Sequence, residues 1–200
     1  SEQQWQEFHR YHDEACELFF EILQESKPLD PWMAAFGIRL CRNLSDGKAQ
    51  AYRLLDQAIA YNPHAEEPYA VMGVLLLPRW AGEDGELERF IQEREKNFGP
   101  GLFGIVAFRV SQLSKVKEEH SLTPERVLQS FHAHAKARPT VYNRNLYARR
   151  AALHYQDRAA SARAFQMLGQ DWDRVAFRNS QAYQLFQEWA SNPKAPYPKF

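Results

Sequence analysis

The chain has 200 residues, of which 44% are hydrophobic and 14% are aromatic. A chain of this length buries roughly 70% of its unfolded surface and folds as one domain or two small ones, and its aromatic content argues against disorder. Lysine plus arginine and aspartate plus glutamate both number 25. No net charge therefore attracts the whole molecule to nucleic acid or to an anionic membrane.

The positions of the two cysteines and the short hydrophobic runs indicate in which cellular compartment the protein is expected. Cys16 and Cys41 each lie within a helical pattern, which is typical of free thiols in a reducing environment. No run approaches the roughly 18 apolar residues of a membrane span, and no charged-then-apolar leader opens the chain. We therefore expect a cytoplasmic protein that does not enter a membrane.

Helical spacing begins near the first residue. A first amphipathic helix carries its apolar stripe at steps of three and four, on Trp5, Phe8, His12, Ala15, Phe19 and Ile22. Lys27-Pro28-Leu29 interrupts this helix. Asp30-Pro31 then provides an N-cap followed by proline at the first helical position.

The same periodicity predicts nine more helices, separated by turn signals. The second spans residues 31–44, and the third carries Ala51 to Ile59 and stops at Asn62-Pro63. The others span residues 66–77, 85–97, 102–116, 124–138, 141–156, 158–168 and 174–191. A strand remains an alternative within 102–116, because Ile105, Val106 and Val110 are β-branched. The sequence thus predicts a single helical domain over 1–191 and a proline-rich extended tail over 192–200.

Residues 32–77 contain a pattern of small, large, small and proline positions. These positions are occupied by Ala51, Leu55, Ala58 and Pro63, and a second set follows at Tyr69, Met72, Gly73 and Leu76. The pattern resembles a tetratricopeptide repeat (TPR) and a half, over about a quarter of the chain. Arg39 and Arg42 depart from it, since the repeat has a small and an aromatic residue there. The resemblance implies antiparallel helix pairs stacked in a TPR-like or irregular α-α superhelical array.

A second pattern extends over residues 54–177. A helix ends in a proline-arginine-tryptophan-glycine turn formed by Leu77, Pro78, Arg79, Trp80 and Gly82. Later matches are Asn145, Tyr147, Ala148, Asp157, Ala160, Ala164, Phe165, Gly169 and Trp172. Together they resemble an uncharacterised bacterial helical domain family. This resemblance implies a helical fold and a bacterial origin, and it implies no activity.

One group of side chains has the chemistry of a metal site. His9, His12, Asp13 and Cys16 recur at steps of three, four and seven on the first helix. A single helix rarely completes a tetrahedral ligand shell, so we interpret these residues as packing residues and expect no metal and no cofactor. Neither cysteine is accompanied by a glycine-rich elbow, and we assign no catalytic residue.

Charge is unevenly distributed along the chain. Residues 1–30 include eight acidic and two basic residues, whereas residues 136–163 include seven basic and one acidic residue. Arginine and tyrosine together can bind an acidic protein surface. The candidate partner-binding residues are Arg144, Arg149, Arg150, Arg158, Arg163, Tyr142, Tyr147 and Tyr155, together with Arg79 and Trp80. The alternatives are a solvated outer face for the basic cluster and a helix-junction role for Arg79 and Trp80.

These observations favour a non-enzymatic protein-binding module. By analogy, its role is that of a neutralising (immunity-type) or adaptor partner of a bacterial protein that has an acidic surface. One alternative is a metal- or histidine-dependent hydrolase that uses the first helix. The other is nucleic-acid binding through the basic C-terminal helices, which the zero net charge makes less favourable.

Overall fold

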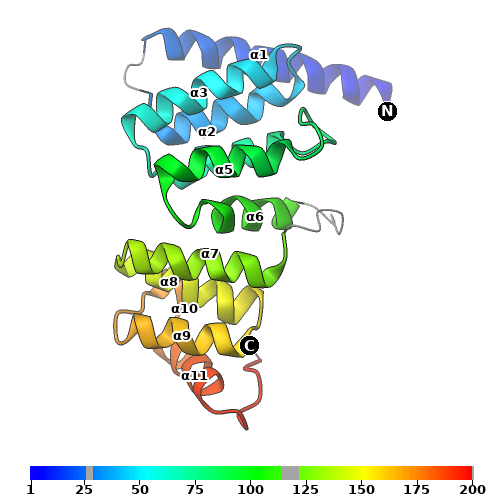
Figure 1. Cartoon of the computed structure of the whole chain (residues 1–200). Coiled ribbons are helices and arrows are strands. Elements are labelled where there is room, and N and C mark those ends of the chain that lie inside the picture. The colour runs from blue at the N-terminus through cyan, green and yellow to red at the C-terminus, as the bar shows by residue number, and fades with distance from the viewer. Residues whose placement is uncertain (26–28, 114–121, 200) are drawn as a thin grey trace. The chain divides into compact units, whose positions relative to one another are not determined.

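The computed structural model describes residues 1–25, 29–113 and 122–199. These residues form helices and contain no β-strand, so the prediction of an all-α fold is confirmed (Figure 1). Their contacts group them into two compact units, where the sequence predicted one domain over 1–191. The described part of 1–98 and 106–113 forms unit 1, and that of 99–105 and 122–199 forms unit 2.

Unit 1 is built from the helices of the first half of the chain. They are α1 (Glu2–Glu25), α2 (Pro31–Leu40), the 3-10 turn η1 (Cys41–Asn43), α3 (Gly47–Tyr61), α4 (Glu66–Leu75) and α5 (Glu86–Phe98). Helix α6 (Leu102–Leu113) contributes residues to both units. Helix α2 packs against α1, α3 and α4, and α4 also contacts α5.

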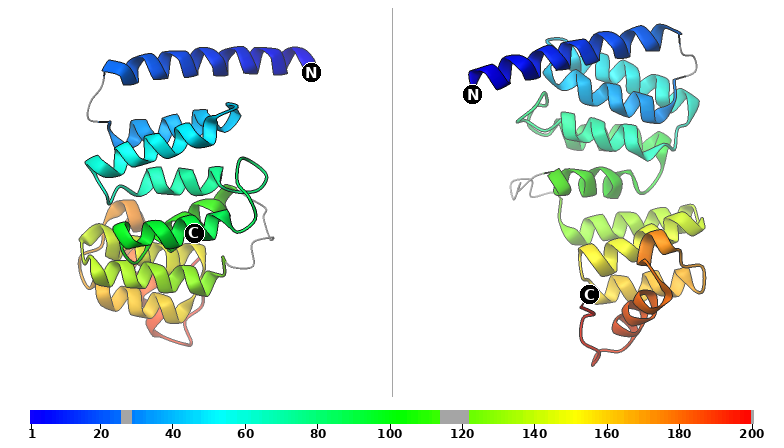
Figure 2. Two further views of the ribbon diagram at one scale, coloured as in Figure 1. Left: turned by 45° about the horizontal axis from the view of Figure 1, so that its top comes forward. Right: turned by 180° about the vertical axis from the view of Figure 1, so that it is seen from behind.

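Unit 2 contains the remaining helices. They are α7 (Pro124–Ala137), α8 (Val141–Arg149), the π-helical segment η2 (Arg150–His154), α9 (Arg158–Leu168), α10 (Arg174–Phe177) and α11 (Ser180–Ser191). Helix α8 packs between α7 and α9, and α9 also packs against α11 (Figure 2).

Helix starts follow local side-chain chemistry, as expected. The Asp30 carboxylate accepts hydrogen bonds from the amides of Trp32 (2.8 Å) and Met33 (3.3 Å). Thr123 caps α7 in the same way, by accepting from the Arg126 amide at 3.3 Å. These side chains satisfy backbone donors that the first helical turn leaves unpaired. Both predicted caps are thus confirmed.

Helix ends differ more from the prediction. The predicted helix over 174–191 is wrong as a single element, because α10 ends at Phe177 and α11 begins at Ser180. Arg178 lies at φ 62°, outside the helical region, and Asn179 caps α11 by accepting from the Ala182 amide at 2.8 Å.

Three other predicted helices end early or change geometry. The helix over 31–44 tightens into η1 after Leu40, and the helix over 66–77 ends at Leu75. The helix over 141–156 becomes π-helical from Arg150. Residues 102–113 are helical, which removes the strand alternative there, whereas 114–116 and the break at Lys27-Pro28 lie outside the described residues.

Close helix contacts in unit 1 depend on small residues. A Cβ atom at Gly37 would lie 2.4 Å from the Phe19 ring, and one at Gly73 would lie 2.3 Å from Val106 Cγ1. Ala51 and Ala58 of α3 are fully buried. The core therefore packs α1 against α2, and α4 against α6, without room for another methyl group at these two glycines.

Replacing Gly73 with alanine should destabilise unit 1. The added methyl group overlaps a β-branched side chain that has little rotamer freedom, and such overpacking costs about 1–3 kcal/mol, more than the ~1 kcal/mol that alanine gains over glycine in a helix. Urea unfolding of Gly73→Ala, Val106→Ala and the double variant tests this. The double variant should cost less than the sum of the two single changes, and strict additivity would contradict the contact.

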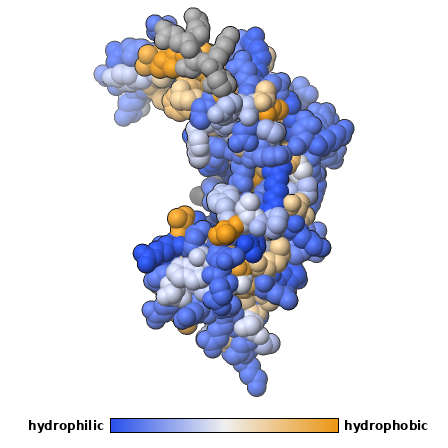
Figure 3. All heavy atoms as spheres, turned by 90° about the vertical axis from the view of Figure 1, so that its left-hand side faces the viewer, coloured by the Kyte–Doolittle hydropathy of each residue, from blue (hydrophilic) through white to orange (hydrophobic). Residues whose placement is uncertain are grey.

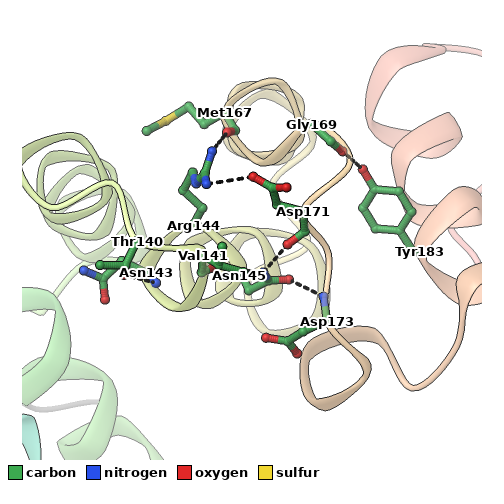
Figure 4. A network of polar contacts seen from close by, with 10 residues as sticks. All are labelled: Thr140, Val141, Asn143, Arg144, Asn145, Met167, Gly169, Asp171, Asp173 and Tyr183. Carbon is green, nitrogen blue, oxygen red and sulfur yellow. Dashed lines mark hydrogen bonds and ion pairs between the residues drawn. The ribbon is translucent and has the colours of Figure 1, made fainter.

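In unit 2, one buried side-chain amide, that of Asn145, fixes the loop that follows α9. The Asn145 side chain donates to the carbonyls of Val141 (2.9 Å) and Asp171 (2.8 Å) and accepts from the Asp173 amide at 3.0 Å (Figure 4). It is 2% exposed. Tyr183 supports the same loop, because its hydroxyl donates to the Gly169 carbonyl.

Replacing Asn145 with alanine should lower the free energy of unfolding by about 2–3 kcal/mol, because two carbonyls and one amide lose their partner in a buried site. Thermal or urea unfolding measures the loss. Gln166→Ala is the matched control, since Gln166 is an exposed amide on α9. Equal stability of the two variants would show that the Asn145 bonds contribute nothing.

The described part of the tail is not helical and lies against unit 2. The Tyr197 hydroxyl donates to the Ala152 carbonyl at 3.1 Å, and its ring centroid lies 5.1 Å from that of Trp189. Arg158 donates to the carbonyls of Asn192 (3.0 Å) and Ala195 (2.7 Å). These contacts fix the tail on the surface of α9 and α11.

Candidate partner-binding site

The turn after α4 presents a tryptophan to solvent. The Trp80 amide donates to the Leu77 carbonyl at 2.8 Å, and the Ala81 amide donates to the Leu75 carbonyl at 3.1 Å. A Cβ atom at Gly82 would lie 1.9 Å from the Leu76 carbonyl oxygen, so the turn requires glycine there. The Trp80 side chain remains 43% exposed. This geometry gives a structural reason for the Pro-Arg-Trp-Ala-Gly sequence.

Two arginines lie over the Trp80 ring. The Arg42 guanidinium carbon is 4.1 Å from the ring centroid, and that of Arg79 is 5.7 Å away. Burial lowers the pKa of Arg42, and the positive charges of Arg79 and Arg39 lower it further. Burial is the larger of these causes, and the effect of the two charges shows that Arg79 and Arg39 lie close to Arg42.

A glutamate joins further arginines to this group. The Glu67 carboxylate accepts from Arg39 Nη2 at 2.5 Å and from Arg109 Nη2. Its side chain is 16% exposed, whereas those of Arg39 and Arg109 are 46% and 31% exposed. One carboxylate from α4 is thus shared by guanidinium groups from α2 and α6.

We call this group the arginine–tryptophan cluster, formed by Arg39, Arg42, Glu67, Arg79, Trp80 and Arg109. Four positive charges against one negative charge give it a formal charge of +3. Guanidinium groups form paired hydrogen bonds with carboxylates, and a half-exposed tryptophan adds apolar contact area. The cluster lies within unit 1 and includes two residues that the sequence singled out, Arg79 and Trp80.

The arginines that the sequence predicted in unit 2 are used differently. Arg144 donates to Asp171 Oδ2 at 2.8 Å and to the Met167 carbonyl at 3.3 Å (Figure 4). Arg158 binds the tail carbonyls and lies 5.2 Å from the Trp189 ring centroid. Both guanidinium groups therefore hold unit 2 together.

The other three arginines have local neighbours. Arg150 Nη1 donates to His154 Nε2 at 3.2 Å. Burial and the Arg150 charge lower the pKa of His154, which keeps its ring neutral and able to accept. Arg149 is half-buried, and Arg163 is exposed beside Tyr147.

The three predicted tyrosines are not equivalent. Tyr147 is fully buried, with its ring centroid 5.4 Å from that of His132, so it cannot contact a partner directly. This corrects its assignment to a binding surface, because Tyr147 lies on the side of α8 that packs into the core of unit 2. Tyr142 is 59% exposed, and Tyr155 is half-buried.

On helix α1, His12 and Cys16 lie on the side that packs against the rest of unit 1. His12 Nε2 donates to the Leu40 carbonyl at 2.9 Å, and Cys16 Sγ lies 3.8 Å from the His12 ring nitrogens. Burial raises the pKa of Cys16, and it raises that of Cys41 to about 11, so both thiols stay protonated at neutral pH. Within residues 1–25, 29–113 and 122–199, no three histidine, cysteine, aspartate or glutamate side chains converge as a metal site would require.

Comparison with protein-family models, with curated proteins and with solved structures finds no match to this chain. In the described part of the chain, no helix combines the length and the apolar character needed to cross a membrane.

Four members of the cluster were not among the partner-binding residues predicted from the sequence: Arg39, Arg42, Glu67 and Arg109. A signal existed for two of them, since Arg39 and Arg42 stand where a tetratricopeptide repeat has a small and an aromatic residue. Glu67 and Arg109 are 42 residues apart and meet only through tertiary packing. No local pattern indicates such a pair.

Replacing Glu67 with glutamine should lower the free energy of unfolding by about 1–2 kcal/mol. The change leaves Arg39 and Arg109 without a shared counter-charge, and the exposure of both arginines limits the loss. Chemical unfolding of Glu67→Gln measures it, with Glu93→Gln on the exposed side of α5 as the control. Identical unfolding midpoints would mean that the shared carboxylate does not stabilise unit 1.

Proposed function

We propose that this chain is a non-enzymatic protein-binding module, in a neutralising or adaptor role, whose arginine–tryptophan cluster binds an acidic segment of a partner protein. The observation that carries the proposal is the pair of guanidinium groups, of Arg42 and Arg79, that lies against the half-exposed ring of Trp80. Arg39, which shares the Glu67 carboxylate with Arg109, is close enough for its charge to act on Arg42. Arginine and tryptophan are the residues most enriched among those that dominate the energy of protein interfaces.

The distribution of bonds within the cluster supports an outside carboxylate at Arg42. Arg39 and Arg109 already share Glu67, whereas the charges that act on Arg42 are those of Arg79 and Arg39. An incoming carboxylate at Arg42 would replace this like-charge repulsion with an ion pair. Because Arg42 is half-buried, that ion pair would be less screened than one at the surface.

The basic residues of unit 2 support the proposal less well. Arg144 and Arg158 are engaged with Asp171 and with tail carbonyls, so a partner would have to compete with bonds that stabilise the fold. Arg149 and Arg163 can still add long-range attraction for an acidic partner. We therefore assign the principal contact to unit 1.

A binding titration tests the proposal. The probe is a fluorescently labelled glutamate-rich peptide, compared with the same peptide in which every glutamate is glutamine. Arg42→Gln and Trp80→Ala should each weaken binding of the glutamate-rich peptide by about tenfold, because each removes one charged or apolar contact. Arg53→Gln is the matched control, since the Arg53 side chain is 69% exposed on α3 of the same unit.

Three results would overturn the proposal. The first is equal affinity for the two peptides, and the second is an equal loss in Arg53→Gln. The third is tight binding of single-stranded RNA or DNA that Arg42→Gln abolishes, which would replace the protein partner with a nucleic acid. Circular dichroism of each variant establishes that it is folded.

A further inference from the structure

Exposed apolar side chains are concentrated at one end of unit 1. Fourteen large apolar side chains are exposed among the described residues, and eight of them lie within the first 36 residues. These eight are Trp5, Phe8, Tyr11, Leu18, Ile22, Trp32, Met33 and Phe36. Single exposed apolar residues are ordinary on a protein surface, but a group of this size marks a contact surface.

The apolar stripe of helix α1 is wider than the surface through which α1 contacts the rest of unit 1. His12, Cys16 and Phe19 form the packed side, with Cys16 6% and Phe19 3% exposed. Leu18 and Ile22, four residues apart on the neighbouring side, remain 59% and 41% exposed. In Figures 1 and 2, α1 lies at the outer edge of unit 1, and it packs against α2.

Helix α2 continues this apolar surface. Trp32 and Phe36 are four residues apart and are 70% and 46% exposed. The Phe36 ring centroid lies 5.7 Å from that of Phe19, which connects the two helices. Figure 3 shows hydrophobic residues at the top of the view.

An acidic row runs beside the exposed side of α1. Glu7, Glu14 and Glu21 are exposed and spaced by seven residues, so they lie on one line of the helix. That line adjoins the line of Tyr11, which is 59% exposed, and Leu18. Arg10 pairs with Glu14 at 3.7 Å and lies 4.7 Å from the Tyr11 ring centroid, so the row is predominantly, not wholly, acidic. An apolar row beside a predominantly acidic row is the arrangement by which a helix selects a basic helix.

We propose that the exposed side of α1, continued by Trp32 and Phe36 of α2, docks a basic amphipathic helix of another protein. The apolar face of that helix covers the exposed leucine, isoleucine and aromatic side chains. Its lysines or arginines lie along the glutamate row. A second copy of this chain fits less well, because two acidic rows would lie close to each other.

This docking surface is separate from the arginine–tryptophan cluster and does not depend on it. The two surfaces bind opposite charges, so a titration with peptides of opposite charge distinguishes them. Failure of one proposal leaves the other unchanged.

The test uses three synthetic helical peptides: one with a leucine face and a lysine face, one with a leucine face and a glutamate face, and one with the leucine–lysine composition in scrambled order. The leucine–lysine peptide should bind, and the other two should not compete with it.

Leu18→Ser combined with Ile22→Ser should weaken binding by at least about tenfold, because both side chains lose buried apolar contacts. Glu14→Gln combined with Glu21→Gln should weaken binding and reduce its dependence on salt.

Two variants serve as controls for these changes. Val175→Ser removes an apolar side chain that is 83% exposed in unit 2, and Glu93→Gln removes an exposed charge on α5. Both should bind the leucine–lysine peptide as the unchanged chain does. Since all the changed side chains are exposed, each variant should keep its helical circular dichroism.

Four outcomes would overturn this proposal. Unchanged binding by the Leu18→Ser, Ile22→Ser variant would place the peptide elsewhere, and displacement of the leucine–lysine peptide by the leucine–glutamate peptide would remove the role of charge. Self-association in sedimentation, lost in the same variant, would make a second copy the occupant. Binding to phosphatidylcholine vesicles, lost in that variant, would make the occupant a lipid surface.

Discussion

The shared carboxylate of Glu67 is the interaction on which the proposed binding site depends. It joins α2, α4 and α6 through Arg39 and Arg109, and it is the acidic member of a cluster that contains four arginines. The fold places the Arg42 and Arg79 guanidinium groups against the Trp80 ring, where the charges of Arg79 and Arg39 act on Arg42.

The two units use arginine for different purposes. In unit 2, Arg144 and Arg158 bind carbonyl groups and Asp171, and these bonds hold the loop after α9 and the tail in place. In unit 1, Arg42 lies on an aromatic ring beside other cations. A count of basic residues along the sequence cannot distinguish an arginine that bonds to carbonyl groups from one that lies on an aromatic ring. The neighbours that make the difference are brought together only by tertiary packing. The excess of basic residues in 136–163 therefore does not by itself show which arginines hold the fold.

Much of the fold could be predicted because its signals are local. Apolar spacing located the helices, and Asp30 and Thr123 capped α2 and α7 as predicted, since a cap involves only residues within one turn. The break at Arg178 could not be predicted, because an arginine at positive φ is held there by its surroundings. The burial of Tyr147 and the pairing of Glu67 with Arg109 likewise depend on helices that are distant in sequence. Arg79 and Trp80 could be singled out from the sequence because a short turn motif contains both.

The central claim is that the cluster around Trp80 in unit 1, and not the basic region of unit 2, binds an acidic partner. Nuclear magnetic resonance tests it directly, by following the tryptophan indole and arginine Nε–H signals while the glutamate-rich peptide is added. The account predicts that the largest shifts occur at Trp80 and Arg42. Shifts that are largest at Arg149 and Arg163, with Trp80 and Arg42 unmoved, would contradict it.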